Sequence, residues 1–313
     1  MTRFLSILIF IFSLSCTSKN ENTPENEAKK PVIAVVNYPL YYFVKSIGGD
    51  HITVYFPSIE GDPAYWKPSS KQVINFQNAD LIIANGAGYA KWMGKVSLPS
   101  SKIVNTSISF EDQWIEANEG LAHSHGPQGE HVHKETVSTT WLNFKFATKQ
   151  AESIHSALVD LLPGHSQALN ENFEQLQKNL GDLDKRMEEI ANSIRARQVI
   201  ASHPVYQYLE SGYGLKIISE HWEPDEMPND DQWNGLKETI KDHPLGIMIW
   251  EDEPLEETKS MLNDLNVLVA VFNPCANTPE TGDFMGIMNE NLQQLKQAIN
   301  AKNHQESALV NPI

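Results

Sequence analysis

The amino-acid sequence predicts an α/β protein of two lobes, each with a mostly parallel sheet flanked by helices, joined by one long rigid helix. Short β-branched apolar runs alternate with segments of helical periodicity, first in the N-terminal half and again in the C-terminal half. Between the halves, residues 164–196 carry apolar side chains three and four positions apart over roughly eight turns. The length of 313 residues also favours two domains over one small core.

The first 30 residues predict export and membrane anchoring. Residues 1–15 combine a basic Arg3 with an apolar run too short to span a bilayer, which is typical of a signal peptide. Cys16 follows a small residue at the end of this run, as at a bacterial lipoprotein cleavage site, so we expect it to be lipidated. Residues 16–30 lack large apolar side chains and are predicted to be a disordered tether. The expected location is the cell envelope, on the periplasmic side or outside the cell.

The N-terminal lobe is predicted to span residues 31–163. Its expected strands are "VIAVVN", "HITVYFP", "DLIIANG" and "KIVNTS", and its expected helices are "PLYYFVKSIGGD", "PSSKQVINFQNA" and the segment from Phe144 to Leu162. Residues 121–135 have no apolar period and form a predicted His-rich loop. This loop, "HSHGPQGEHVH" at its centre, carries His123, His125, His131 and His133.

The C-terminal lobe, residues 197–313, repeats the same alternation without a close sequence repeat. The runs "QVIAS", "LKIIS", "IMIW" and "VLVAVF" are predicted strands with helical segments between them. Ligands of such sheets bind beyond the carboxyl ends of the strands. Polar residues predicted at those ends are His203, His221, Glu251 and Cys275.

The formal net charge of −16 argues against nucleic acid, because phosphate binding needs a basic face. The same charge is compatible with attraction of cations, and equally with simple solubility. The sequence offers neither a nucleophile–base pair at a telling spacing nor the H-E-x-x-H motif, so an enzyme is not predicted.

The chain resembles the metal-binding receptors of bacterial zinc and manganese ABC importers, in which a rigid helix joins two α/β lobes. The resemblance extends from Val32 to about Ala301 and rests on "VVNYPLYYFVKSIGGD", "GDPAYWKP", "NADLIIANGAGYAKWMGK", the His-rich loop before "TTWLNF", "ASHPVYQYLESGYGLK" and "FNPCAN". It implies a receptor that captures a divalent metal and delivers it to a membrane permease. The His-rich loop favours zinc, with Mn²⁺ second.

The family usually supplies three histidines and one carboxylate, and this chain departs from that set. Ala64 follows Asp62-Pro63 where the first histidine is expected, and Thr139 stands where the second is expected. His203 in "ASHPVY" matches the third. Asn273 replaces the carboxylate before Pro274. Since zinc prefers thiolate, imidazole or carboxylate ligands, other groups must compensate, or the ligand has changed.

The candidate compensating ligands are the four loop histidines together with His221, Glu251 and Cys275. Each has an alternative interpretation: packing for His221, an ion pair or helix cap for Glu251, a buried thiol for Cys275, and a solvated loop for the histidines. Aromatic residues also accumulate at the predicted site positions. Tyr65, Trp66, Trp141, Trp222 and Trp250 would either fill a core or line a cleft for an organic ligand.

The predicted function is therefore a lipid-anchored binding protein of an ABC importer that captures zinc. The alternatives are a receptor of the same fold for a metal chelate or small organic ligand, and a periplasmic zinc buffer. The expected partners are a permease in the membrane and the membrane itself through Cys16. One-to-one docking on a permease would suit a monomer.

Overall fold

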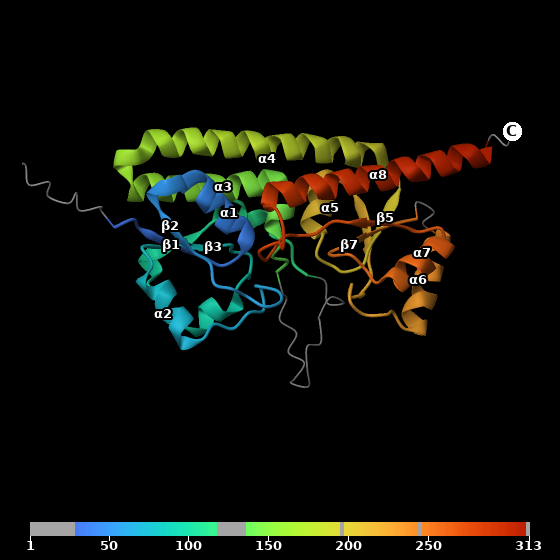
Figure 1. The fold of residues 1–313 in the computed structure, drawn as a ribbon, viewed down its shortest axis with the longest axis horizontal. Helices are drawn as coiled ribbons and strands as arrows, with labels where there is room; N and C mark the ends of the chain where they lie inside the picture. Colours follow the sequence, from blue (N-terminus) through green and yellow to red (C-terminus); the bar gives the residue numbers. More distant parts are fainter. Residues whose placement is uncertain (1–28, 118–135, 195–196, 243–245, 311–313) are drawn as a thin grey trace, which may run out of the picture. The chain divides into compact units, whose positions relative to one another are not determined.

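The computed structural model describes residues 29–117, 136–194, 197–242 and 246–310, and its two parallel sheets confirm the fold class predicted from the sequence (Figure 1). Each sheet has four strands, in the orders β2-β1-β3-β4 and β6-β5-β7-β8. In both, the chain first adds a strand on one side of the starting strand and then crosses to its other side. The two sheets therefore share one topology, and each has a switch point between its two central strands.

The N-terminal sheet contains β1 (Val32–Val35), β2 (Thr53–Tyr55), β3 (Leu81–Ala84) and β4 (Ile103–Asn105). Its helices are α1 (Tyr38–Gly48), α2 (Ser70–Asn78) and α3 (Phe144–Leu161). The helices begin where polar caps satisfy backbone N–H groups. Asn37 accepts from the Leu40 N–H at the start of α1, and Ser69 forms a capping box with Gln72 at the start of α2.

The C-terminal sheet contains β5 (Gln198–Ala201), β6 (Lys216–Ser219), β7 (Ile247–Trp250) and β8 (Leu268–Val271). The helices of this half are α5 (Gln207–Tyr213), α6 (Asp230–Asp242), α7 (Glu256–Asp264) and α8 (Phe284–Val310). Strand β7 is buried along its whole length because strands and helices cover it on every side. Helix α8 extends beyond the helix that the run "FMGIMNENLQQLKQAINA" predicts, which ends at Ala301.

Helix α4 (Ser166–Ile194) is the long helix predicted between the two halves. Its buried side chains follow the three-and-four spacing that the sequence shows, and they include Leu169, Leu176, Leu180, Leu183, Met187 and Ile190. The helix packs against α1 and α3 of the N-terminal half and against α5 and α8 of the C-terminal half (Figure 1). Pro163, in a short 3₁₀ turn, separates it from α3.

Hydrogen bonds between distant segments join the two halves. The Trp141 indole N–H donates to the Pro274 carbonyl at 2.7 Å, and the Thr139 hydroxyl donates to the Val205 carbonyl at 2.6 Å. The Asn277 side chain donates to the Ile59 carbonyl at 2.7 Å. Residues Pro31–Ile313 consequently form one compact unit rather than two separate ones.

No helix in residues 29–117, 136–194, 197–242 or 246–310 combines the length and apolar character that crossing a bilayer requires. Cys16 and the predicted signal peptide and tether, through residue 28, lie outside the described residues.

Candidate metal site at the ends of strands β5, β6 and β7

The switch point of the C-terminal sheet brings two predicted site residues to the same edge. Strands β5 and β7 are hydrogen-bonded neighbours, and the Ser202 N–H donates to the Ile249 carbonyl at 2.9 Å where they end. His203 lies two residues beyond β5, and Glu251 lies one residue beyond β7. Because the carboxyl ends of parallel strands meet at one edge, a ligand-binding position is expected here.

His203 is the most enclosed of the predicted metal-binding histidines that the structure describes, with 17% of its side chain exposed. Its Nδ1 atom lies 3.6 Å from an oxygen of Glu223. The His203 and His221 rings approach edge to face, with their centroids 6.0 Å apart. Two imidazoles and one carboxylate therefore gather beyond the ends of β5 and β6.

Glu251 belongs to the same acidic surroundings. Burial is the largest influence and raises the pKa of the Glu251 carboxyl to about 8. The negative charges of Asp62, Glu223 and Asp252 act in the same direction and contribute to this value. Withdrawal from solvent also raises the pKa of Asp62, partly offset by the hydrogen bond that its carboxylate accepts from the Ala64 N–H. Acidic groups from both halves of the chain thus face this region, which favours a cation.

The positions where the family resemblance expects other ligands have structural roles here. Ala64 packs, half-buried, against the main core. Thr139 uses its hydroxyl in the bond to Val205. The Asn273 side-chain oxygen accepts from the Cys275 N–H at 2.7 Å and stabilises the turn after β8. Of the expected set, only His203 retains a metal-binding side chain.

Cys275 is a buried free thiol whose surroundings oppose ionisation. Burial, with a smaller effect of Asp283, raises the pKa of the thiol to about 12. The thiolate is the form that binds metals. Metal binding at Cys275 would therefore carry the cost of deprotonating a thiol in an environment that favours the neutral form.

The structure places most of the singled-out aromatic residues in the core. Trp141, Trp222 and Trp250 are at least 99% buried, and Trp222 packs edge to face on Trp233 and Trp250. Trp66 is half-buried, and Tyr65 is half-exposed. Three of the five side chains consequently support the packing of the described lobes rather than line an open surface.

The predicted His-rich loop lies outside the described residues, which resume at Thr136. It carries His123, His125, His131 and His133. An antiparallel bridge between Glu116 and Thr136 brings the two sides of the loop together. Within the described ranges, no three His, Cys, Asp or Glu side chains stand close enough to hold one metal ion as they are placed.

Glu223 is the site residue that sequence reasoning missed. The sequence places "EHWE" after "LKIIS", the second apolar run of the C-terminal half, so both His221 and Glu223 lie within the predicted strand-end segment. The sequence signal that could have identified Glu223 is the alternation of polar and apolar residues in this segment. His221 and Glu223 are exposed on either side of the buried Trp222, as alternate residues of an extended chain would be.

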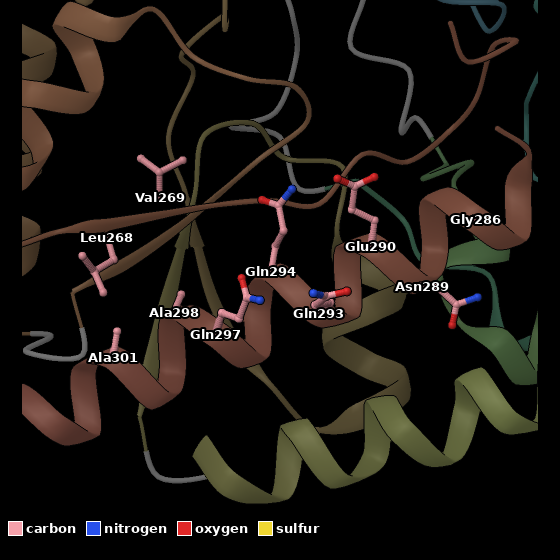
Figure 2. Close-up of a pocket in the computed structure, with 10 residues that line it drawn as sticks. All are labelled: Leu268, Val269, Gly286, Asn289, Glu290, Gln293, Gln294, Gln297, Ala298 and Ala301. Atoms are coloured by element: carbon pink, nitrogen blue, oxygen red, sulfur yellow. The ribbon is translucent and has the colours of Figure 1, made fainter. Parts of the chain in front are cut away.

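A groove on the described surface lies away from these strand ends. It has a volume of about 700 Å³ and runs along α8 beside Leu268 and Val269 of strand β8. Figure 2 shows that amide side chains of α8, those of Asn289, Gln293, Gln294 and Gln297, dominate this groove. Glu290 is its one ionisable lining residue among those described, so it lacks the ligands that a metal requires.

Two lobes, each built on a parallel β-sheet, and one long helix that joins them are the features of the class of two-lobed, helix-linked binding proteins. Within that class, the sequence profile of the family described as the periplasmic component A of the zinc-uptake complex, ZnuA, matches residues 33–298. The chain belongs to this family.

Known relatives support the same assignment. The chain is 26% identical over 306 residues to the zinc-binding lipoprotein AdcA of Streptococcus pneumoniae, a match that covers 94% of the chain but 60% of that protein. It is 25% identical over 318 residues to the high-affinity zinc uptake system protein ZnuA of Bacillus subtilis, with 96% and 97% covered. The crystal structure of the Zn(II)-bound ZnuA-like domain of S. pneumoniae AdcA has a TM-score of 0.73 at 22% identity, covering 87% of this chain and 99% of that one.

Proposed function

We propose that this protein is an extracytoplasmic receptor of an ABC importer and that it captures zinc for uptake. The observation that carries the proposal is His203, a metal-binding side chain at the switch point of the C-terminal sheet in a chain of the ZnuA family. Relatives named for zinc binding or zinc uptake support the choice of metal. The metal is cargo, so the protein is a binding protein rather than an enzyme.

The proposed metal-binding groups are His203, His221 and Glu251, which the fold brings to adjoining strand ends. The four loop histidines act as collectors that raise the local concentration of zinc, since imidazole is a zinc ligand. Cys275 has the smallest part because its thiol resists ionisation. Neutral imidazole is the ligating form, so zinc affinity falls as the pH is lowered.

The domain organisation that we propose follows the function. Residues 1–15 direct export, and Cys16 carries a lipid that anchors the protein at the envelope membrane. Residues 16–30 form the tether, residues 31–163 the first lobe, 164–196 the linking helix and 197–313 the second lobe. One molecule then docks as a monomer on its permease, and a relative named as a lipoprotein supports the lipid anchor.

The test is calorimetric titration of the chain carrying Cys16→Ser with Zn²⁺ and, separately, with Mn²⁺ near neutral pH. We expect one tight zinc site per chain and weaker binding of Mn²⁺. His203→Ala should weaken zinc binding at least about 100-fold, because it removes a direct ligand rather than a supporting group. His304→Ala, an exposed histidine on α8, is the matched control and should bind as the unmodified chain does. Absence of zinc binding by the unmodified chain would contradict the proposed function.

A further inference from the structure

We propose that Glu223 is a direct metal ligand and that, with His203 and His221, it forms a zinc site carried by the C-terminal lobe alone. This inference rests on the proposed function and adds Glu223 to the metal-binding groups proposed there. It departs from the expected arrangement, in which ligands come from both lobes.

The first argument is the distance between His203 and Glu223. Their Nδ1 and Oε1 atoms are 3.6 Å apart, which is longer than a hydrogen bond between nitrogen and oxygen. Two ligand atoms of a tetrahedral zinc ion, each about 2.0–2.1 Å from the metal, stand roughly 3.4 Å apart. The pair thus already has nearly the separation of two ligands that share one ion.

The second argument is the way in which Trp222 positions its neighbours. Its indole ring is buried, and its backbone N–H donates to the Ser202 carbonyl at 2.8 Å. These two contacts attach the segment after β6 to the residue that precedes His203. Because alternate side chains of an extended segment share a side, anchoring Trp222 inward directs His221 and Glu223 outward together.

The third argument is the reach of His221. Two imidazoles on one tetrahedral zinc ion have ring centroids about 5 Å apart, given the metal–nitrogen distance. The present distance between the His203 and His221 centroids is 6.0 Å. His221 is exposed, so a modest side-chain rotation closes the difference. The site is therefore a preformed pair that a third side chain completes when the metal arrives.

The N-terminal lobe offers little at the corresponding ligand positions. Ala64 has no ligating atom, and the Thr139 hydroxyl already donates to Val205. Asp62 adds negative charge near Glu251 without contacting the His203–Glu223 pair in any described interaction. A site on one lobe consequently forms without the two lobes closing around the ion.

The experiment is zinc calorimetry on the chain carrying Cys16→Ser, comparing Glu223→Gln with Glu226→Gln. Glu226 is a second exposed glutamate of the same segment, so its substitution makes the same change in charge. We expect Glu223→Gln to weaken zinc binding at least about 100-fold and Glu226→Gln to leave it unchanged. A third variant lacking residues 123–133 should keep the tight site.

The outcomes separate the inference from the proposed function. If the parent chain binds zinc and Glu223→Gln binds equally well, Glu223 is not a ligand and the inference fails while the function stands. Loss of tight binding on removal of residues 123–133 would also overturn it, because the loop would then hold the metal. If the parent chain binds no zinc, the proposed function itself fails.

Discussion

The switch points of the two sheets share one topology, but the kinds of side chain at them differ. In the N-terminal sheet, Asn37 lies two residues beyond β1 and Asn85 lies one residue beyond β3. In the C-terminal sheet, the corresponding positions hold His203 and Glu251. A pair of neutral amides thus faces one strand end, and a pair of ionisable groups faces the other.

Hydrogen bonds within the N-terminal lobe occupy the side chains of the Asn37–Asn85 pair. The Asn37 amide donates to the Asn85 side-chain oxygen at 3.2 Å, and the Gln150 amide donates to the same oxygen at 3.1 Å. The Asn85 amide in turn donates to the Ser138 carbonyl at 2.9 Å. Buried and mutually bonded amides stabilise a core, whereas partly exposed acids and imidazoles remain available to a ligand. The same topology therefore stabilises the core in one lobe and, in the other, carries the metal site that we propose.

Among the substitutions that test this comparison, Asn85→Leu is expected to have the largest effect on stability. The substitution removes an acceptor of the buried Asn37 amide, one of the two acceptors of the Gln150 amide, and the donor to the Ser138 carbonyl. We expect a loss of about 2–4 kcal/mol in the free energy of unfolding, measured by denaturant titration, with zinc affinity retained. Asn263→Leu, on the exposed face of α7, is the control and should cost far less. Loss of zinc binding in folded Asn85→Leu would show that both switch points take part in binding.

Glu251→Gln is expected to change how the stability of the metal-free protein depends on pH. The folded protein retains the Glu251 proton up to about pH 8, whereas the unfolded chain releases it near the ordinary value of 4.5. The stabilisation is therefore complete below pH 4.5 and is lost as the pH rises through about 8.

Thermal unfolding in chelator between pH 5 and 9 measures this effect. The melting temperature of the parent chain should fall more steeply with rising pH than that of Glu251→Gln. Asp252→Asn, at an exposed neighbour, should keep most of the parent slope. Parallel curves for the parent chain and Glu251→Gln would mean that this strand end is as electrostatically neutral as the Asn37–Asn85 pair.

The smallest effect is expected from Thr139→Val. The change keeps the shape of the side chain but removes the hydrogen bond to the Val205 carbonyl, which should cost about 1 kcal/mol of unfolding free energy. Thr139→Ser retains the hydroxyl and serves as the control. Zinc affinity should be the same in both variants. A weaker zinc site in Thr139→Val alone would mean that Thr139 contributes to binding after all.

The regular elements of the fold could be predicted because their signals are local. The β-branched runs, the spacing of Leu169 through Ile190 and the break at Pro163 each depend on a few neighbouring residues. Strand order and the equivalence of the two switch points depend on pairings between distant segments, which no local pattern reveals. The end of α8 was placed too early because its last turns lack a strong apolar period.

In the candidate site, too, local patterns could be read from the sequence, whereas contacts between distant segments could not. His203 is predicted as a ligand from its motif, and His221 and Glu251 are predicted from their positions after apolar runs. The proximity of Glu223 to His203 could not be read from the sequence, because it depends on the buried Trp222 and its bond to Ser202. Burial of Trp141, Trp222 and Trp250 was similarly undetermined, since an aromatic residue at a strand end suits a core as well as a cleft.

Helix α4 has a mechanical consequence. Its 29 residues form a rod about 43 Å long at 1.5 Å of rise per residue. A tilt of about 5° at one end of such a rod displaces the other end by roughly 4 Å. A small change in how α4 packs against α1 and α3 would therefore displace the C-terminal sheet by several ångströms even if neither lobe changed internally.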